Sequence, residues 1–205
     1  MTQTILAGLV AGYGLAVPVG AVAVLMVTMT ARTSFRMGAA AAMGAVTADG
    51  LYTVAAVLGG RALARTIEPF ATPLTWIAAL ILLAMAIRIV RTATTAKGTA
   101  SRALTPTSAW RSYLVFLGLT ALNPWPAIYF AALILGRHAQ GGLSGTETVA
   151  YVSAILLAST SWQLLLAAGG SALARTLTSP RSQKLTSVTS GALIGGLAIS
   201  MLATG

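Results

Sequence analysis

Residues 37–58, MGAAAAMGAVTADGLYTVAAVL, decide the fold of this chain. The stretch is apolar throughout apart from a few small polar side chains, and about 20 such residues form a helix that crosses a hydrocarbon core of about 30 Å. Asp49, the thirteenth residue of the stretch, is its only acidic side chain. The stretch therefore predicts a membrane-spanning helix with a carboxylate near its centre.

Similar apolar runs fill most of the remaining chain. Of its 205 residues, 57% are hydrophobic and 8% are charged, whereas soluble domains contain about 25% charged residues. We therefore predict an all-α membrane protein with one transmembrane domain, 1–205, and no soluble catalytic or nucleic-acid-binding domain. The six predicted spans, of which the third and sixth are the shortest, are 5–29, 37–58, 74–90, 113–135, 149–168 and 188–203.

The basic residues predict the orientation of the spans. Ten of the 13 Lys and Arg residues lie in or beside the connections after the first, third and fifth spans, and three lie in the other connections. Because cytoplasmic connections are enriched in Lys and Arg, we expect the odd connections in the cytoplasm and both termini on the outside. The ten are Arg32, Arg36, Arg88, Arg91, Lys97, Arg102, Arg111, Arg175, Arg181 and Lys184, and the three are Arg61, Arg65 and Arg137.

The two halves of the chain have a common pattern. Three spans precede the predicted cytoplasmic connection at about 91–112 and three follow it, so the second triplet enters the membrane from the opposite side, as in an inverted repeat. The first span of each triplet contains proline near its centre, in LAVPVG (15–20) and in LNPWP (122–126). Proline removes a backbone donor and breaks a helix, and paired broken spans are typical of transporter binding sites. The alternative is a pair of kinks that serve packing alone.

Asp49 is the only acidic side chain inside the six predicted spans. A carboxylate at the bilayer centre costs about 2.5 to 3.5 kcal/mol on insertion scales, and no basic residue is predicted at a comparable depth to pair it. Burial favours the protonated form, which suits exchange of protons in a proton-coupled antiporter. Two other interpretations stay open. Asp49 is either a permanently protonated group bonded to a carbonyl or to Tyr52, or a ligand for a substrate amino group.

Other polar residues cluster near the middle of the same spans. Asn123 beside Pro124 either caps freed backbone or binds a polar ligand. The fifth span carries a central polar run from Ser159 to Gln163, opposite Thr47, Asp49, Tyr52 and Thr53 of the second span. Aromatic side chains here, Trp125, Tyr129 and Trp162, are interpreted either as packing or as cavity wall. The predicted substrate-binding residues are Pro18, Gly20, Asp49, Tyr52, Asn123, Pro124, Ser161 and Gln163.

The sequence argues against a metal site, a cofactor and an enzyme function. The chain has no cysteine and one histidine, His138, which is placed in an outward connection. Protein metal sites need several such ligands, so neither a metal site nor redox chemistry is expected. No second acid, base or nucleophile accompanies Asp49 at depth, which argues against an intramembrane enzyme.

Five motifs in order resemble the LysE/RhtB family of amino-acid exporters over nearly the whole chain. They are Pro18-Val19-Gly20, the glycine- and alanine-rich run 38–49 ending at Asp49, 119–128 with Asn123-Pro124, Ser161-Trp162, and the glycine-rich run 190–197.

The resemblance implies proton-driven export of small amino acids or related metabolites across the bacterial cytoplasmic (inner) membrane. It also implies that Pro18, Gly20, Asp49, Asn123 and Pro124 match functional positions of the family. The chain departs from the family pattern at Ala21, Val22, Ala78 and Ala86, which suggests a more apolar cavity and leaves the substrate open.

We therefore predict a secondary active exporter that works by alternating access at a midplane site, with a half-helix N-terminus meeting the substrate carboxylate. The expected partners are a small-molecule substrate, protons and the lipid bilayer, and the small-residue helix faces would permit a homodimer. The alternatives are an inorganic-ion or metal exporter of the same superfamily and a membrane scaffold that transports nothing.

Overall fold

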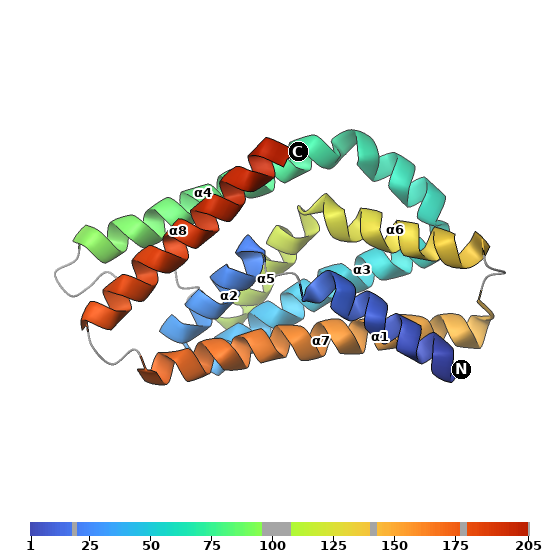
Figure 1. Ribbon diagram of the computed structural model, residues 1–205, viewed down its shortest axis with the longest axis horizontal. Helices are drawn as coiled ribbons and strands as arrows, with labels where there is room; N and C mark the ends of the chain where they lie inside the picture. Colours follow the sequence, from blue (N-terminus) through green and yellow to red (C-terminus); the bar gives the residue numbers. More distant parts are fainter. Residues whose placement is uncertain (18–19, 96–107, 140–142, 177–179, 205) are drawn as a thin grey trace.

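The computed structural model describes residues 1–17, 20–95, 108–139, 143–176 and 180–204, which form helices and contain no strand. The predicted all-α membrane fold is therefore confirmed for this part of the chain (Figure 1). The elements are α1 (Thr2–Ala16), α2 (Ala21–Arg32), α3 (Phe35–Ile67), the short 3₁₀ helix η1 (Glu68–Phe70), α4 (Ala71–Thr95), α5 (Ala109–Ala121), α6 (Pro124–Ala139), α7 (Gly145–Thr176) and α8 (Pro180–Thr204).

Four stretches of these helices are long and apolar enough to cross a membrane. Two bent helix pairs, α1 with α2 and α5 with α6, raise the number to six if each pair forms one span, which is the predicted number. The third span is longer than its predicted range of 74–90. The four unbroken stretches are Phe35–Gly59, Arg65–Arg91, Gly145–Ala174 and Lys184–Ala203.

The bends lie where proline was expected to break the first and fourth spans. The axes of α5 and α6 differ by 62°, and α6 begins at Pro124. The axes of α1 and α2 differ by 79°, while Pro18, which lies between these helices in sequence, is outside the described residues. A further break at Gly59, where the backbone is not helical, divides the long helix α3.

The main helix pairings join the two halves of the chain and come in matched sets. Helix α3 packs against α5 and α6, and α7 packs against α1 and α2 in the same way. Helices α3 and α7 also pack against each other, as do α4 and α8 (Figure 1). Exchanging the first four α-helices for the last four therefore interchanges these pairings, whereas the contact between α2 and α3 has no counterpart of similar extent between α6 and α7 in the described part of the chain.

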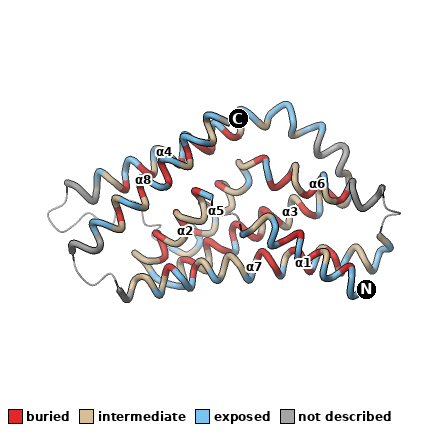
Figure 2. Tube along the Cα trace, viewed as in Figure 1, coloured by how far each residue is buried: buried red, intermediate tan, exposed pale blue. Residues whose placement is uncertain are grey.

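Small residues allow this close helix packing, as expected from the sequence. A Cβ atom added at Gly8 or Gly12 of α1 would lie 2.7 Å from Cβ of Ala154 or Ala158 of α7. The corresponding contact in the other half joins Gly44 of α3 to the backbone of α5. Buried residues lie along the helix faces that meet, whereas many outward positions are exposed (Figure 2). The outward apolar side chains, such as the 83% exposed Leu58, suit contact with lipid.

Basic helix ends gather at one end of the bundle. The ends of α2, α4 and α7 lie there together with the beginnings of α3, α5 and α8 (Figure 1). The N-terminus of the chain, η1 and the beginning of α7 lie at the opposite end (Figure 1). That the basic end faces the cytoplasm stays a prediction from the charge distribution.

Candidate functional site

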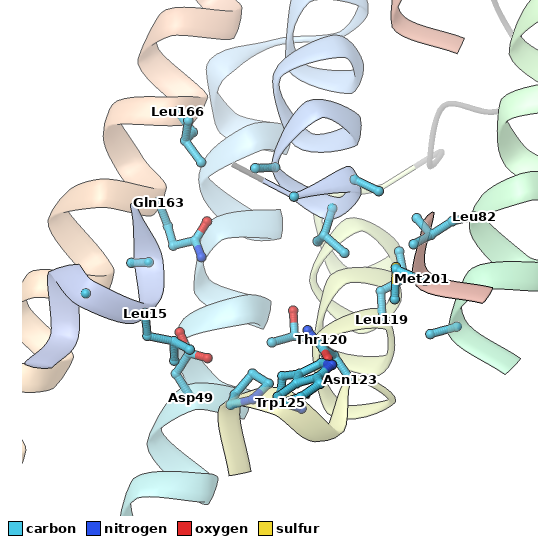
Figure 3. A pocket seen from close by; sticks show the side chains of 18 residues that line it. Leu15, Asp49, Leu82, Leu119, Thr120, Asn123, Trp125, Gln163, Leu166 and Met201 are labelled. Atoms are coloured by element: carbon cyan, nitrogen blue, oxygen red, sulfur yellow. Dashed lines mark hydrogen bonds between the residues drawn. The ribbon is translucent and has the colours of Figure 1, made fainter. Parts of the chain in front are cut away.

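A cavity of about 330 Å³ lies between the two broken helix pairs and the centres of α3 and α7 (Figure 3). Helices α4 and α8 contribute part of its wall. Most of the lining is apolar, and the polar side chains on it are those of Asp49, Thr120, Asn123, Trp125 and Gln163. The apolar lining residues and the glycines are Gly14, Leu15, Ala16, Gly20, Ala21, Val22, Ala23, Ala78, Leu82, Leu119, Pro126, Leu166 and Met201.

Asp49 is 4% exposed and brings a carboxylate to the cavity wall from the centre of α3. Ser159, on the facing helix α7, donates a hydrogen bond from Oγ to Asp49 Oδ2 at 2.7 Å. No Lys or Arg side chain lines the cavity in the described part of the chain. The carboxylate therefore has a neutral hydroxyl partner, and its partner is not Tyr52, the side chain that the sequence suggested.

The N-terminus of α2 borders the cavity with backbone donors that have no acceptor within the helix. Its first helical hydrogen bond runs from Val24 N to Gly20 O at 3.2 Å, and no side chain caps the helix. The N–H groups of the three residues between them, Ala21, Val22 and Ala23, thus have no acceptor within the helix. All three residues line the cavity. Together with the helix dipole, they make this end of α2 attractive to an anion.

The N-terminus of α6 offers no equivalent set of donors. Pro124 and Pro126 have no N–H, and Trp125 donates its N–H to Asn123 Oδ1 at 3.2 Å. Asn123 is therefore the N-cap of α6, with proline at the first helical position. Of the two interpretations of Asn123, the capping role is the one that this contact supports, although the residue also lines the cavity.

Tyr52 supports the same break from α3. In an unbroken helix the Ala121 carbonyl would accept the Trp125 N–H, which here bonds to Asn123. Tyr52 donates its O–H to Ala121 O at 2.5 Å instead. The side chain therefore satisfies backbone freed by the break, as required of polar backbone groups inside a membrane protein.

The last turn of α1 borders the same cavity. Gly14, Leu15 and Ala16 line it. In a continuous helix the Gly14 carbonyl would accept the N–H of residue 18, but Pro18 has none. The C-terminal end of a helix carries partial negative charge, so this edge of the cavity attracts cations, as Asp49 does.

The cavity brings together four of the predicted substrate-binding residues and leaves three outside its lining. Gly20, Asp49, Asn123 and Gln163 line it, and Gln163 points into it from α7 (Figure 3). Tyr52, Pro124 and Ser161 do not. Pro124 is buried at the start of α6, and Ser161 Oγ is hydrogen-bonded to the hydroxyl of Tyr13 at 2.8 Å. Pro18 lies outside the described residues.

The aromatic candidates have different surroundings. Trp125 lines the cavity, whereas Tyr129 donates its O–H to Ala11 O at 3.1 Å and so connects α6 with α1. Trp162 Nε1 is buried without a hydrogen-bond acceptor among the described residues.

The predicted site omitted the hydrogen-bond partner of Asp49 and several residues that line the cavity. Ser159 had a visible signal, because it belongs to the central polar run of the fifth span. Thr120, Leu82 and Met201 had none, because threonine and apolar residues are ordinary components of a membrane helix. The part of the chain that the structure describes contains no group of three His, Cys, Asp or Glu residues able to hold a metal ion.

Comparison with protein families gives one match. The model of the family described as LysE type translocator matches residues 14–205, which include the cavity and every described helix except the first part of α1. Comparisons with curated proteins and with solved structures give no match. Translocators are membrane transporters rather than enzymes, in agreement with the helices that are long and apolar enough to cross a membrane. The chain belongs to the LysE type translocator family.

Proposed function

We propose that this translocator is a proton-coupled secondary exporter of amino acids or related small metabolites, with its substrate site in the cavity beside Asp49. The observation that carries the proposal is the position of a buried carboxylate and of an uncapped helix N-terminus on one cavity between two broken spans. Such discontinuous spans form substrate sites in secondary transporters.

One edge of the cavity attracts cations and another attracts anions, an arrangement that fits a zwitterionic substrate. A substrate ammonium group would bind Asp49 and the carbonyl end of α1, and a substrate carboxylate would bind the N–H groups of Ala21, Val22 and Ala23. We assign the carboxylate to α2 rather than α6, because the prolines and Asn123 leave α6 without equivalent donors.

Proton coupling in this proposal depends on Asp49 alone. A proton and a substrate ammonium group would compete for the same carboxylate, so binding of one would release the other. The proton would enter from the outside and leave to the cytoplasm while the substrate moves outward. Coupling of this kind needs a single acidic group at the substrate site, and Asp49 is the only acidic residue on the cavity lining.

Alternating access would move the two halves of the chain relative to each other. The matched helix pairings support a repeat architecture, and the bond between Asp49 of α3 and Ser159 of α7 joins the two halves at the cavity. We propose that substrate or proton binding at Asp49 changes this contact, which would link occupancy of the site to the relative position of the halves.

Efflux from vesicles tests the proposal. Purified protein is reconstituted in proteoliposomes preloaded with single radiolabelled amino acids, and release is measured with and without an imposed pH gradient. Faster release of at least one amino acid with the gradient, compared with protein-free vesicles, is the expected result. Release of none of them, or release that ignores the gradient, would contradict the proposal.

The cavity also bears on the alternative functions. A membrane scaffold would bury Asp49 and both breaks in continuous packing, whereas Asp49 and parts of both breaks line a cavity. An exporter of metal ions would need several hard or soft ligands, and Asp49 is the one acidic ligand on this lining. The first observation favours a transporter over a scaffold, and the second favours an organic substrate over a metal ion.

A further inference from the structure

The wall of the cavity opposite Asp49 indicates which substrate side chain the site accepts, an inference that rests on the proposed export function. We infer that the site takes a neutral amino acid with an aliphatic side chain, which packs against Leu82, Leu119 and Met201. The same wall rejects amino acids with cationic side chains.

The cavity has a carboxylate on one side and an apolar wall on the other. Asp49 and Leu15 lie on the first side, and Leu82, Leu119 and Met201 lie together on the second, with Thr120, Asn123 and Trp125 between them (Figure 3). A substrate whose ammonium group binds Asp49 and whose carboxylate binds the start of α2 would direct its side chain toward this apolar trio.

Two of the three residues of the apolar wall are buried in a hydrophobic core. Leu82 of α4 is 1% exposed and Leu119 of α5 is 4% exposed, and both belong to the larger of the two hydrophobic cores. Met201 of α8 packs against that core and is only partly buried. Because close-packed interiors yield little to extra volume, Leu82 should limit the size of the substrate side chain. The flexible Met201 is the residue best able to adjust to it.

The charges on the cavity disfavour a substrate that carries a second positively charged group. Asp49 is already assigned to the ammonium group, and the other two acidic residues of the chain do not line the cavity. Glu68 lies in η1, and Glu147 accepts hydrogen bonds from the Ser144 N–H and O–H at 3.0 and 2.8 Å near the start of α7. A cationic side chain against Leu82 would therefore be desolvated without an anionic partner, which is strongly unfavourable.

The volume of the cavity agrees with a small substrate. At about 330 Å³ it lies at the lower end of the range of about 300 to 1,000 Å³ for small-molecule sites. Bulky substrates would therefore have to displace part of the leucine wall, which favours amino acids of modest size.

Competition and transport with a defined panel test the inference on the intact protein. Efflux of alanine, valine, leucine, lysine and arginine is measured from preloaded proteoliposomes, and stabilisation of the purified protein by each amino acid is measured by thermal unfolding. Valine or leucine should be released at least about tenfold faster than lysine or arginine, in line with the discrimination that pocket contacts provide. Only the aliphatic group should raise the unfolding temperature.

Two pairs of variants test the wall itself. Leu82→Ala should shift the preference toward larger aliphatic side chains, whereas Leu80→Ala, on the exposed face of the same helix, should leave the preference unchanged. Met201→Glu should raise the ratio of lysine to leucine efflux by about tenfold, and Met201→Gln, which has the same shape without the charge, should not.

The outcomes separate this inference from the export function. Export of lysine at the rate of leucine, or equal effects of Met201→Glu and Met201→Gln on the lysine to leucine ratio, would overturn the side-chain assignment while leaving the exporter intact. Export and binding of no amino acid in the panel would overturn the proposed function and the side-chain assignment with it.

Discussion

Ser159 of α7 donates its hydroxyl hydrogen to the Asp49 carboxylate of α3 at 2.7 Å, and both residues are almost completely buried. The two side chains come from different halves of the chain and meet where the two central helices pack together. The contact therefore belongs to the proposed substrate site and to the interface between the halves.

Replacement of the carboxylate tests coupling. Asp49→Asn keeps the size of the side chain and its ability to accept a hydrogen bond from Ser159, but it removes the exchangeable charge. We expect gradient-driven efflux to be lost, while the yield and the unfolding temperature of the purified protein stay near those of the wild type. Proteoliposome efflux with an imposed pH gradient measures the first quantity. Efflux by Asp49→Asn at the wild-type rate would refute the coupling role.

Loss of the Ser159 hydroxyl should leave a buried carboxylate without its partner. Removing one partner of a buried hydrogen bond costs about 1 to 3 kcal/mol, so Ser159→Ala should lower the free energy of unfolding by this order. Denaturant titration in detergent measures it. Ser153→Ala, on the exposed face of the same helix, is the matched control and should change little. The effects of Ser159→Ala and Asp49→Ala on the free energy of unfolding should not add, because each substitution removes the same hydrogen bond.

The Tyr52 hydroxyl supports the break between α5 and α6. Tyr52→Phe leaves the Ala121 carbonyl without its donor and should cost about 0.5 to 1.5 kcal/mol in the free energy of unfolding. Efflux should slow as well, because the break between α5 and α6 would lose a hydrogen bond that connects it to α3. Wild-type stability together with wild-type efflux in Tyr52→Phe would show that the Ala121 carbonyl needs no support from α3.

Two glycines should respond in opposite directions to the same substitution. In Gly44→Ala the new methyl group would meet the Tyr113 carbonyl oxygen of α5, so we expect a loss of about 1 to 3 kcal/mol from overpacking. In Gly118→Ala the methyl group meets no atom within 4 Å, and alanine should stabilise helix α5 by up to about 1 kcal/mol. Thermal unfolding of the two variants side by side measures the difference. A lower unfolding temperature of Gly118→Ala would contradict the expectation that the new methyl group has room beside α5.

The all-helical membrane fold, the positions of the two bends and the unusual status of Asp49 were predictable from sequence. Each depends on local chemistry. A run of about 20 apolar residues is sufficient for a span, and a proline lacks the backbone donor wherever it occurs. Even the unsuitability of α6 as an anion site follows from covalent structure, because Pro124 and Pro126 remove two of its first donors.

The partners of these groups depended on the tertiary structure. Asp49 and Ser159 are separated by 110 positions in sequence, and Tyr52 reaches a carbonyl 69 positions away. No local pattern specifies which hydroxyl meets the carboxylate, because several polar side chains of similar character lie on both central spans. Leu82 and Met201 resemble lipid-facing residues in sequence, and only packing of α4 on α8 brings them to the cavity. Hydropathy and proline chemistry act within one helix, whereas the site is created by contacts between helices distant in the chain.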